Sequence, residues 1–159
     1  MALSLAITAT ANQKHLIQTI EAMFAAQPGY TILNDLSIAA EASSVADVSN
    51  ILTDFADNTD TADNFAASLV TNLKVTVENG ISEANVTLLT EYVTAQLNGA
   101  DKASWGSVVA TIVESYSSLV DNVDFGSAVK KFNDTVNASL NYSLDANNTG
   151  INSPAESVV

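Results

Sequence analysis

Four aspartates recur at every third position in the segment TDFADNTDTADNF, which spans residues 53–65. They are Asp54, Asp57, Asp60 and Asp63. Hard cations such as Ca²⁺ are bound by clustered carboxylate and carbonyl oxygens. An acidic, asparagine-rich junction between two helices therefore predicts a Ca²⁺ site formed by these four aspartates. The segment is not an EF-hand, because the glycine and the closing bidentate glutamate of that loop are missing.

The same residues have a simpler interpretation. Asp and Asn are preferred at helix N-caps, and a carboxylate in the first turn of a helix interacts favourably with the helix dipole. On this interpretation, which is the more common outcome, the segment consists of caps and solvated surface. A second, weaker candidate of the same kind is the group Asp121, Asn122 and Asp124.

The inventory of catalytic residues is poor. His15 is the single histidine, and a general base needs a positioned partner and a pocket. Serine is abundant, but no G-x-S-x-G elbow and no glycine-rich phosphate loop occur. The chain has neither cysteine nor arginine, which removes thiolate chemistry and planar phosphate or carboxylate clamps. We therefore expect no enzymatic activity, and no cofactor other than Ca²⁺.

Four aromatic side chains could stack on sugar rings, because aromatic faces pack well on apolar surfaces. They are Tyr92, Trp105, Tyr116 and Tyr142. Their helical spacing favours a role in the core instead.

Apolar residues recur with helical periodicity along most of the chain. The pattern predicts six to seven short helices, around residues 16–24, 32–40, 45–55, 65–73, 88–97, 108–120 and 125–140. The expected fold is all-α, a compact multi-helix bundle or a stacked array. Residues 1–144 are expected to form one helical domain, and residues 145–159 a tail or linker toward a further domain.

Local signals place several of the helix ends. Ser44 and Ser82 are expected N-caps, with Asp47 three residues after the first of them. The Gln27-Pro28-Gly29 run is expected to stop the first helix. The alternating stretch 74–77 is the best strand candidate, but an isolated strand has no partner, so we interpret it as a helix end.

The charge balance restricts the partners. Eighteen acidic residues oppose five lysines, giving a net charge of -13, although only 14% of residues are charged. Nucleic acids and anionic membranes are therefore excluded as direct partners. Binding to an anionic polymer requires bridging divalent cations. No stretch approaches the ~20 apolar residues of a membrane span, and no basic residue precedes Lys14, so no Sec-type signal is expected.

The order FADNFAASLVTNL, ISEANVTLLTEYVTAQLNGA, SWGSVVATIVESYSSL and FGSAVKKFNDTVNASLNYS resembles the helical N-terminal regions of bacterial S-layer and RTX-type surface proteins. The likeness lies in pattern and composition over about residues 45–143. It implies type I secretion, a location on the cell surface, assembly into a lattice and contact with lipopolysaccharide. The G-G-x-G-x-D repeats of that family are absent from this sequence.

The expected function is therefore a non-catalytic, cell-surface structural module that anchors or assembles a surface layer with copies of itself, in a Ca²⁺-dependent way. The alternative is a subunit of a self-assembling extracellular filament or sheath. A third hypothesis, a helical enzyme or small-molecule carrier, needs a pocket with convergent polar groups.

Overall fold

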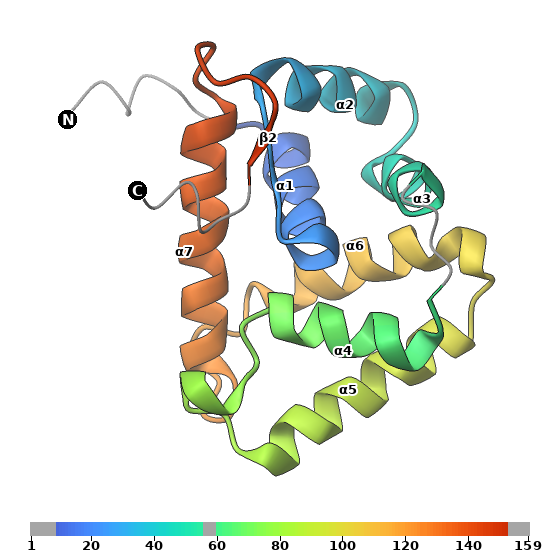
Figure 1. Ribbon diagram of the computed structural model, residues 1–159, viewed down its shortest axis with the longest axis vertical. Helices are drawn as coiled ribbons and strands as arrows, with labels where there is room; N and C mark the ends of the chain where they lie inside the picture. Colours follow the sequence, from blue (N-terminus) through green and yellow to red (C-terminus); the bar gives the residue numbers. More distant parts are fainter. Residues whose placement is uncertain (1–8, 56–59, 153–159) are drawn as a thin grey trace.

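A computed structural model describes residues 9–55 and 60–152 of the chain. The expectation of an all-α, multi-helix fold is confirmed (Figure 1). The helices of the described residues are α1 (Ala11–Phe24), α2 (Tyr30–Ala42), α3 (Val45–Phe55), α4 (Ala62–Asn72), α5 (Glu83–Asn98), α6 (Trp105–Tyr116) and α7 (Gly126–Ser143). Two single-turn 3₁₀ helices, η2 (Val77–Asn79) and η3 (Lys102–Ser104), precede α5 and α6.

Helix α6 lies at the centre of the packing, in contact with α1 on one side and α3 on another. Helix α4 packs on α5, and α7 stands beside α1 at one edge of the molecule (Figure 1). One apolar cluster runs through all of these contacts, so the helices share a single core. No helix among the described residues is long and apolar enough to cross a membrane.

The helix starts follow local chemistry, as expected. The Ser44 hydroxyl accepts a hydrogen bond from the Asp47 N–H at 3.0 Å, and Ser82 caps α5 in the same way at 3.2 Å. Helix α1 begins with a full capping box, in which Thr10 and Gln13 exchange backbone and side-chain bonds. These caps satisfy N–H groups that the first turn of a helix leaves without partners.

The first helix ends at Phe24, where the pattern predicts, and a left-handed residue ends it. Ala25, with φ 50° and ψ 46°, ends α1 by donating its N–H to the carbonyl of Glu21. The following residues, Gln27–Pro28, do not merely stop the helix. They form a short strand, β1, which pairs antiparallel with β2 (Ile151–Asn152) from the other end of the chain.

Replacing Ala25 by glycine is expected to stabilise the fold by about 0.5–1 kcal/mol. The left-handed region costs an L-residue roughly 1–2 kcal/mol, part of which is offset by the larger entropy of glycine in the unfolded chain. Urea unfolding measures the change. The matched control is Ala42→Gly inside the last turn of α2, which is expected to destabilise by up to about 1 kcal/mol. A destabilising Ala25→Gly would contradict the prediction.

Residues 74–77 do not form a strand in the structure, in agreement with the expectation. Helix α4 ends at Asn72, Lys74 takes a left-handed conformation with φ 69°, and the chain turns into η2. The Tyr116 hydroxyl donates to the carbonyl of Leu73 at 2.6 Å, which holds this corner onto α6.

The segment 145–152 returns from the end of α7 to cover β1, and we call it the strap. It is held by the β1–β2 pairing and by a 3.0 Å bond from the Tyr30 N–H to the carbonyl of Asn148. Gly29 makes this approach feasible, because a Cβ there would lie 2.6 Å from the carbonyl oxygen of Gly150. Residues 153–159 lie outside the described residues.

Candidate functional site

The four aspartates of the predicted Ca²⁺ site are spread over a helix end and a helix start. Asp54 is exposed near the end of α3, and Asp63 is exposed in the first turn of α4. The backbone carbonyl of Asp60 accepts a hydrogen bond from the Lys102 ammonium at 2.8 Å. Asp57 lies outside the described residues.

The described aspartates of this segment do not come together as a cation site. Within residues 9–55 and 60–152, no group of three or more His, Cys, Asp or Glu side chains is placed to hold a metal ion. Asp63 instead lines a shallow hollow between α4 and α5, of about 380 Å³, together with Glu91. The Ca²⁺ site therefore stays a prediction.

The second acidic group has a structural role. The side-chain oxygen of Asn122 accepts bonds from the N–H groups of Asp124 and Phe125, at 2.9 and 3.0 Å. Two N–H groups just before α7 are satisfied in this way. The amide oxygen of Asn122 is thus already engaged within the protein.

His15 is part of the packing of α1 on α6. Its Nε2 lies 2.7 Å from the carbonyl oxygen of Ala110, so this nitrogen carries the proton and donates. A ring held in that way braces two helices.

The aromatic residues divide into a buried pair and two more accessible side chains. Trp105 is buried, donates to the Leu97 carbonyl at 3.0 Å, and packs on Phe65 with ring centroids 5.2 Å apart. Tyr116 is also buried, and burial raises the pKa of its hydroxyl well above the usual range. Tyr142 is partly buried, whereas Tyr92 is 53% exposed. The expected core role is therefore confirmed for Trp105 and Tyr116 and is wrong for Tyr92.

Tyr92 belongs to a surface groove between α5 and α6, of about 410 Å³, which we call the α5–α6 groove. Its apolar walls come from Leu89 on α5, from Val108 and Ile112 on α6, and from Leu119 just after α6. Gln96, Thr111 and Ser115 are its polar lining residues, and no charged side chain of the described residues lines it. The periodicity of the sixth helix predicts Leu119 in the core, but α6 ends at Tyr116 and Leu119 is 40% exposed.

A second groove, of about 260 Å³, lies between the end of α1, α2 and the strap, and we call it the α1–α2 groove. All of its lining residues are apolar: Ile20, Phe24, Ala26, Pro28, Ile32, Leu36, Leu52 and Ile151. Phe24 and Ile151 stand at its exposed rim. In a chain of net charge -13, two hollows lined by uncharged residues are surfaces suited to exclude water against a partner.

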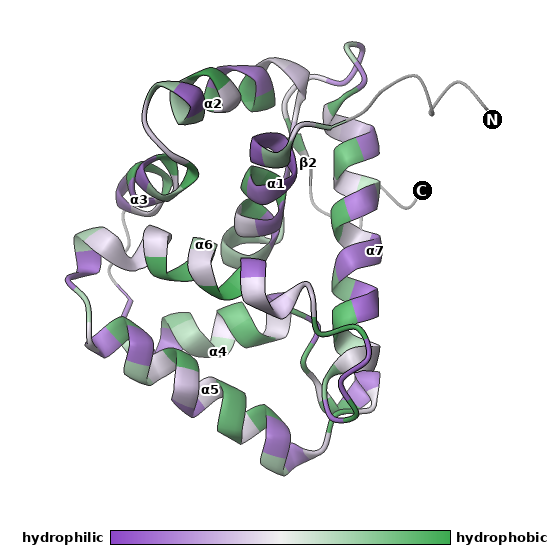
Figure 2. Ribbon diagram, turned by 180° about the vertical axis from the view of Figure 1, so that it is seen from behind, coloured by the Kyte–Doolittle hydropathy of each residue, from purple (hydrophilic) through white to green (hydrophobic). Residues whose placement is uncertain are grey.

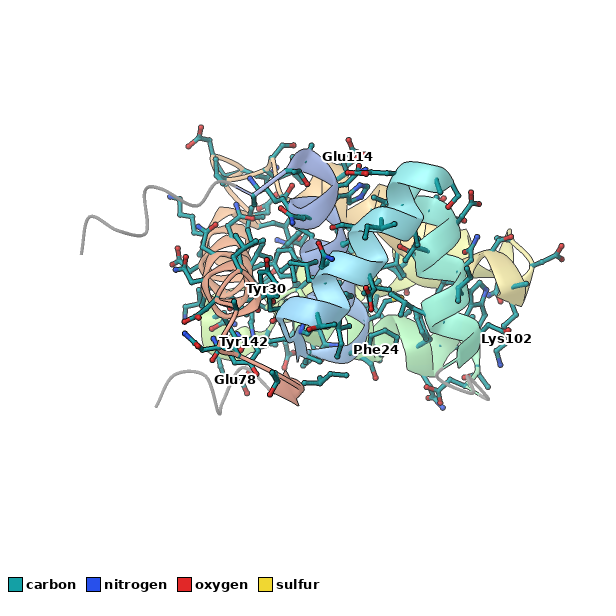
Figure 3. The ribbon with its side chains drawn as sticks, turned by 90° about the horizontal axis from the view of Figure 1, so that it is seen from above. Phe24, Tyr30, Glu78, Lys102, Glu114 and Tyr142 are labelled. Atoms are coloured by element: carbon teal, nitrogen blue, oxygen red, sulfur yellow. The ribbon has the colours of Figure 1, made fainter. Side chains whose placement is uncertain are left out.

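The two grooves share no lining residue and lie between different helices. Helices α5 and α6 are in the foreground when the molecule is seen from behind (Figure 2). Seen from above, Phe24 at the end of α1 and Glu114 on α6 project to opposite sides (Figure 3). A protein with two separate grooves of this kind can contact two partners at once.

The most unusual titratable group is Glu21 on α1, which is 2% exposed. Burial raises the pKa of this carboxyl from 4.5 to about 7, although a hydrogen bond from Ser139 and the positive charge of Lys74 both act to lower it. Sequence reasoning did not single out Glu21. The spacing of Glu21 could have indicated that it is buried. Glu21 belongs to the i, i+3, i+4, i+7 pattern of one helix face, together with Ile17, Ile20 and Phe24.

Comparison with known proteins identifies no relative: no family model, no curated protein and no solved structure matches this chain. The functional interpretation therefore rests on the geometry described above and on the sequence.

Proposed function

We propose that this chain is a non-catalytic structural protein of a cell surface, which assembles with copies of itself into a surface layer. The observation that carries the proposal is the presence of two separate grooves with no charged lining residue, one between α5 and α6 and one between α1, α2 and the strap. When the α5–α6 groove of one copy meets the α1–α2 groove of the next, each copy keeps one free groove, and the pair keeps one of each kind. A head-to-tail contact whose rotation does not close a ring continues into a filament, and lateral contacts between filaments give a sheet.

The titratable groups support the same proposal. His15 is engaged with a backbone carbonyl, and Glu21 is shielded from solvent, so neither is positioned in a groove to act on a substrate. Exposed Tyr92 and Leu88 provide apolar area at the α5 surface, where a neighbouring copy can cover it.

Charge repulsion between copies has to be offset, and this requirement motivates the proposed role of Ca²⁺. Copies with a net charge of -13 repel each other unless counterions or bridging cations accumulate between them. Bridging Ca²⁺ would also link the acidic surface to anionic lipopolysaccharide, the polymer that the resemblance to S-layer proteins implies. A filament or sheath subunit is the alternative, since the head-to-tail geometry serves both.

The test is a pair of groove variants with a matched control. Tyr92→Asp places a charge in the α5–α6 groove, Phe24→Asp places one in the α1–α2 groove, and Val123→Asp adds the same charge at a 97% exposed position outside both. Sedimentation and electron microscopy in millimolar Ca²⁺ are expected to show large assemblies for the wild type and Val123→Asp. Either groove variant alone should stay monomeric, with its helical circular dichroism retained.

Mixing the two groove variants distinguishes the geometry. Each variant keeps the groove that the other has lost, so an equimolar mixture is expected to form dimers that grow no further. Assembly of either single variant to wild-type size would contradict the head-to-tail contact. A wild-type protein that stays monomeric at high concentration in Ca²⁺ would refute the proposal itself, and equal assembly in EDTA would remove only the role of Ca²⁺.

A further inference from the structure

Four buried polar side chains meet where the C-terminal half of α7 packs on α1 and β1, and we call them the polar seam. They are Glu21, Gln27, Ser139 and Ser143. Glu21 is 2% exposed and the other three are 0% exposed. Polar groups so deep in a core are costly unless each is hydrogen-bonded.

Two hydroxyl groups tie α7 to its neighbours in this seam. The Ser139 hydroxyl donates to the Glu21 carboxyl on α1. One turn further along α7, the Ser143 hydroxyl donates to the carbonyl of Pro28 in β1 at 2.6 Å. The strap begins immediately after this second bond, so the seam sets where the strap starts.

The Gln27 side chain, the remaining member of the seam, lacks hydrogen bonds. Neither the nitrogen nor the oxygen of the Gln27 amide has a hydrogen-bond partner in the described part of the chain. Gln27 pairs with Asn152 of the strap, and its side chain is fully buried. Hydration of this amide in an open state would offset part of the free energy that opening costs. The unsatisfied Gln27 amide therefore makes the closed state less stable relative to the open state.

Beyond the seam, the strap itself has few anchors. The side chains of Asp145, Asn147, Thr149 and Ile151 are exposed, and the strap is bound to β1 mainly through backbone pairings. Two additional bonds join the strap to α7: the Tyr142 hydroxyl donates to the carbonyl of Thr149 at 3.2 Å, and the Asn148 side-chain amide donates to the carbonyl of Tyr142 at 2.9 Å. A segment held in this way opens at low cost compared with a core helix.

The charged groups around Glu21 leave its carboxylate poorly compensated. The positive charge that acts on it is Lys74, which follows α4 and is partly exposed. On α1 itself, Lys14 is exposed and His15 is bonded to Ala110. The other charged side chains of the helices packed on α1 are exposed: Asp35 and Glu41 on α2, Asp47 and Asp54 on α3, Asp63 on α4, Glu114 on α6, and Lys130, Lys131 and Asp134 on α7.

We propose that the polar seam is a proton-controlled latch, in which neutral Glu21 keeps the end of α7 and the strap closed on β1, and loss of its proton to water releases them. Release exposes the backbone edge of β1 and widens the α1–α2 groove, whose rim includes Ile151. The cause is electrostatic: a carboxylate in this seam has one hydroxyl donor among the described residues, whereas in the open state it is hydrated. The latch acts within one chain, and does not depend on the assembly proposed above.

A distance measurement across the strap tests the latch. Because the chain has no cysteine, spin labels can be attached uniquely through Ala39→Cys on α2 and Ala146→Cys in the strap, both exposed positions. Double electron–electron resonance between pH 5 and pH 8 then reports the closed and open distances. The ratio of open to closed molecules is expected to rise about tenfold per pH unit from about pH 5 to about pH 7, and to level off above.

Three further variants make the result specific. Glu21→Gln should keep the short distance at every pH, and exposed Glu114→Gln should behave as the wild type. Ser139→Ala removes the hydroxyl that favours the carboxylate, so the plateau should move to higher pH. A single, unchanged distance in the wild type at pH 8 would overturn the latch, and so would a pH response that persists in Glu21→Gln.

Discussion

Replacing Gly106 by alanine is expected to destabilise the fold by about 3–5 kcal/mol, a loss comparable with the most disruptive core substitutions. A Cβ at this position would meet the carbonyl group of Ser49 on α3 at a separation that real Cβ atoms essentially never show. The obstacle is backbone, so no side chain can rotate away. Relief requires α3 and α6 to move apart.

The same movement would break a hydrogen bond. The N–H of Ser107 donates to the side-chain oxygen of Asn50 at 2.7 Å, across the α3–α6 crossing. Urea unfolding of Gly106→Ala measures the loss. Gly99→Ala is the matched control, because its Cβ would approach no atom closer than 3.4 Å and its φ of -79° suits any residue. A loss below about 1 kcal/mol for Gly106→Ala would show that the two backbones separate easily.

The stability of the fold is expected to fall as the pH rises from about 5 to about 7. In the folded state Glu21 keeps its proton up to a pKa of about 7, whereas the unfolded chain releases it near 4.5. Between these values the folded state binds more protons, so each step up in pH favours unfolding. The folded and unfolded pKa values differ by about 2.5, at about 1.4 kcal/mol for each pH unit, which gives a total loss of at most about 3.5 kcal/mol.

Chemical denaturation of the wild type and Glu21→Gln, side by side at pH 5 and pH 8, isolates this contribution. The two proteins are expected to have similar stabilities at pH 5, and Glu21→Gln to be the more stable at pH 8 by up to about 3 kcal/mol. General charge repulsion affects both alike, and Glu114→Gln on the surface controls for the removal of one negative charge. An equal pH dependence in the wild type and Glu21→Gln would contradict a raised pKa for Glu21.

The helices and many of their ends could be predicted from the sequence because they depend on neighbours in the chain. Ser44 and Ser82 cap helices through bonds to N–H groups three residues away. The way in which α1 ends was not predicted, because Ala25 carries no sequence signal for a left-handed conformation. The strand Gln27–Pro28 was also missed, because its partner lies more than 120 residues away.

The candidate sites were predicted less well than the helices, because the exposure of a side chain depends on which helices pack against each other. Tyr92 and Leu88 continue the apolar periodicity of α5, yet no helix of the described residues covers them. Glu21 would ordinarily be exposed, and it is buried because α7 packs over it. The aspartate segment was singled out by its composition, whereas its described aspartates lie on different elements.

The close crossing of α3 and α6 has a consequence for the dimensions of any array. Leu52 on α3 lines one groove, and Val108 and Ile112 on α6 line the other. Because Gly106 brings the two backbones into direct contact, the spacing between these walls is set by main-chain geometry. In an array built through both grooves, the repeat distance would be fixed by this glycine and insensitive to the exchange of surface side chains.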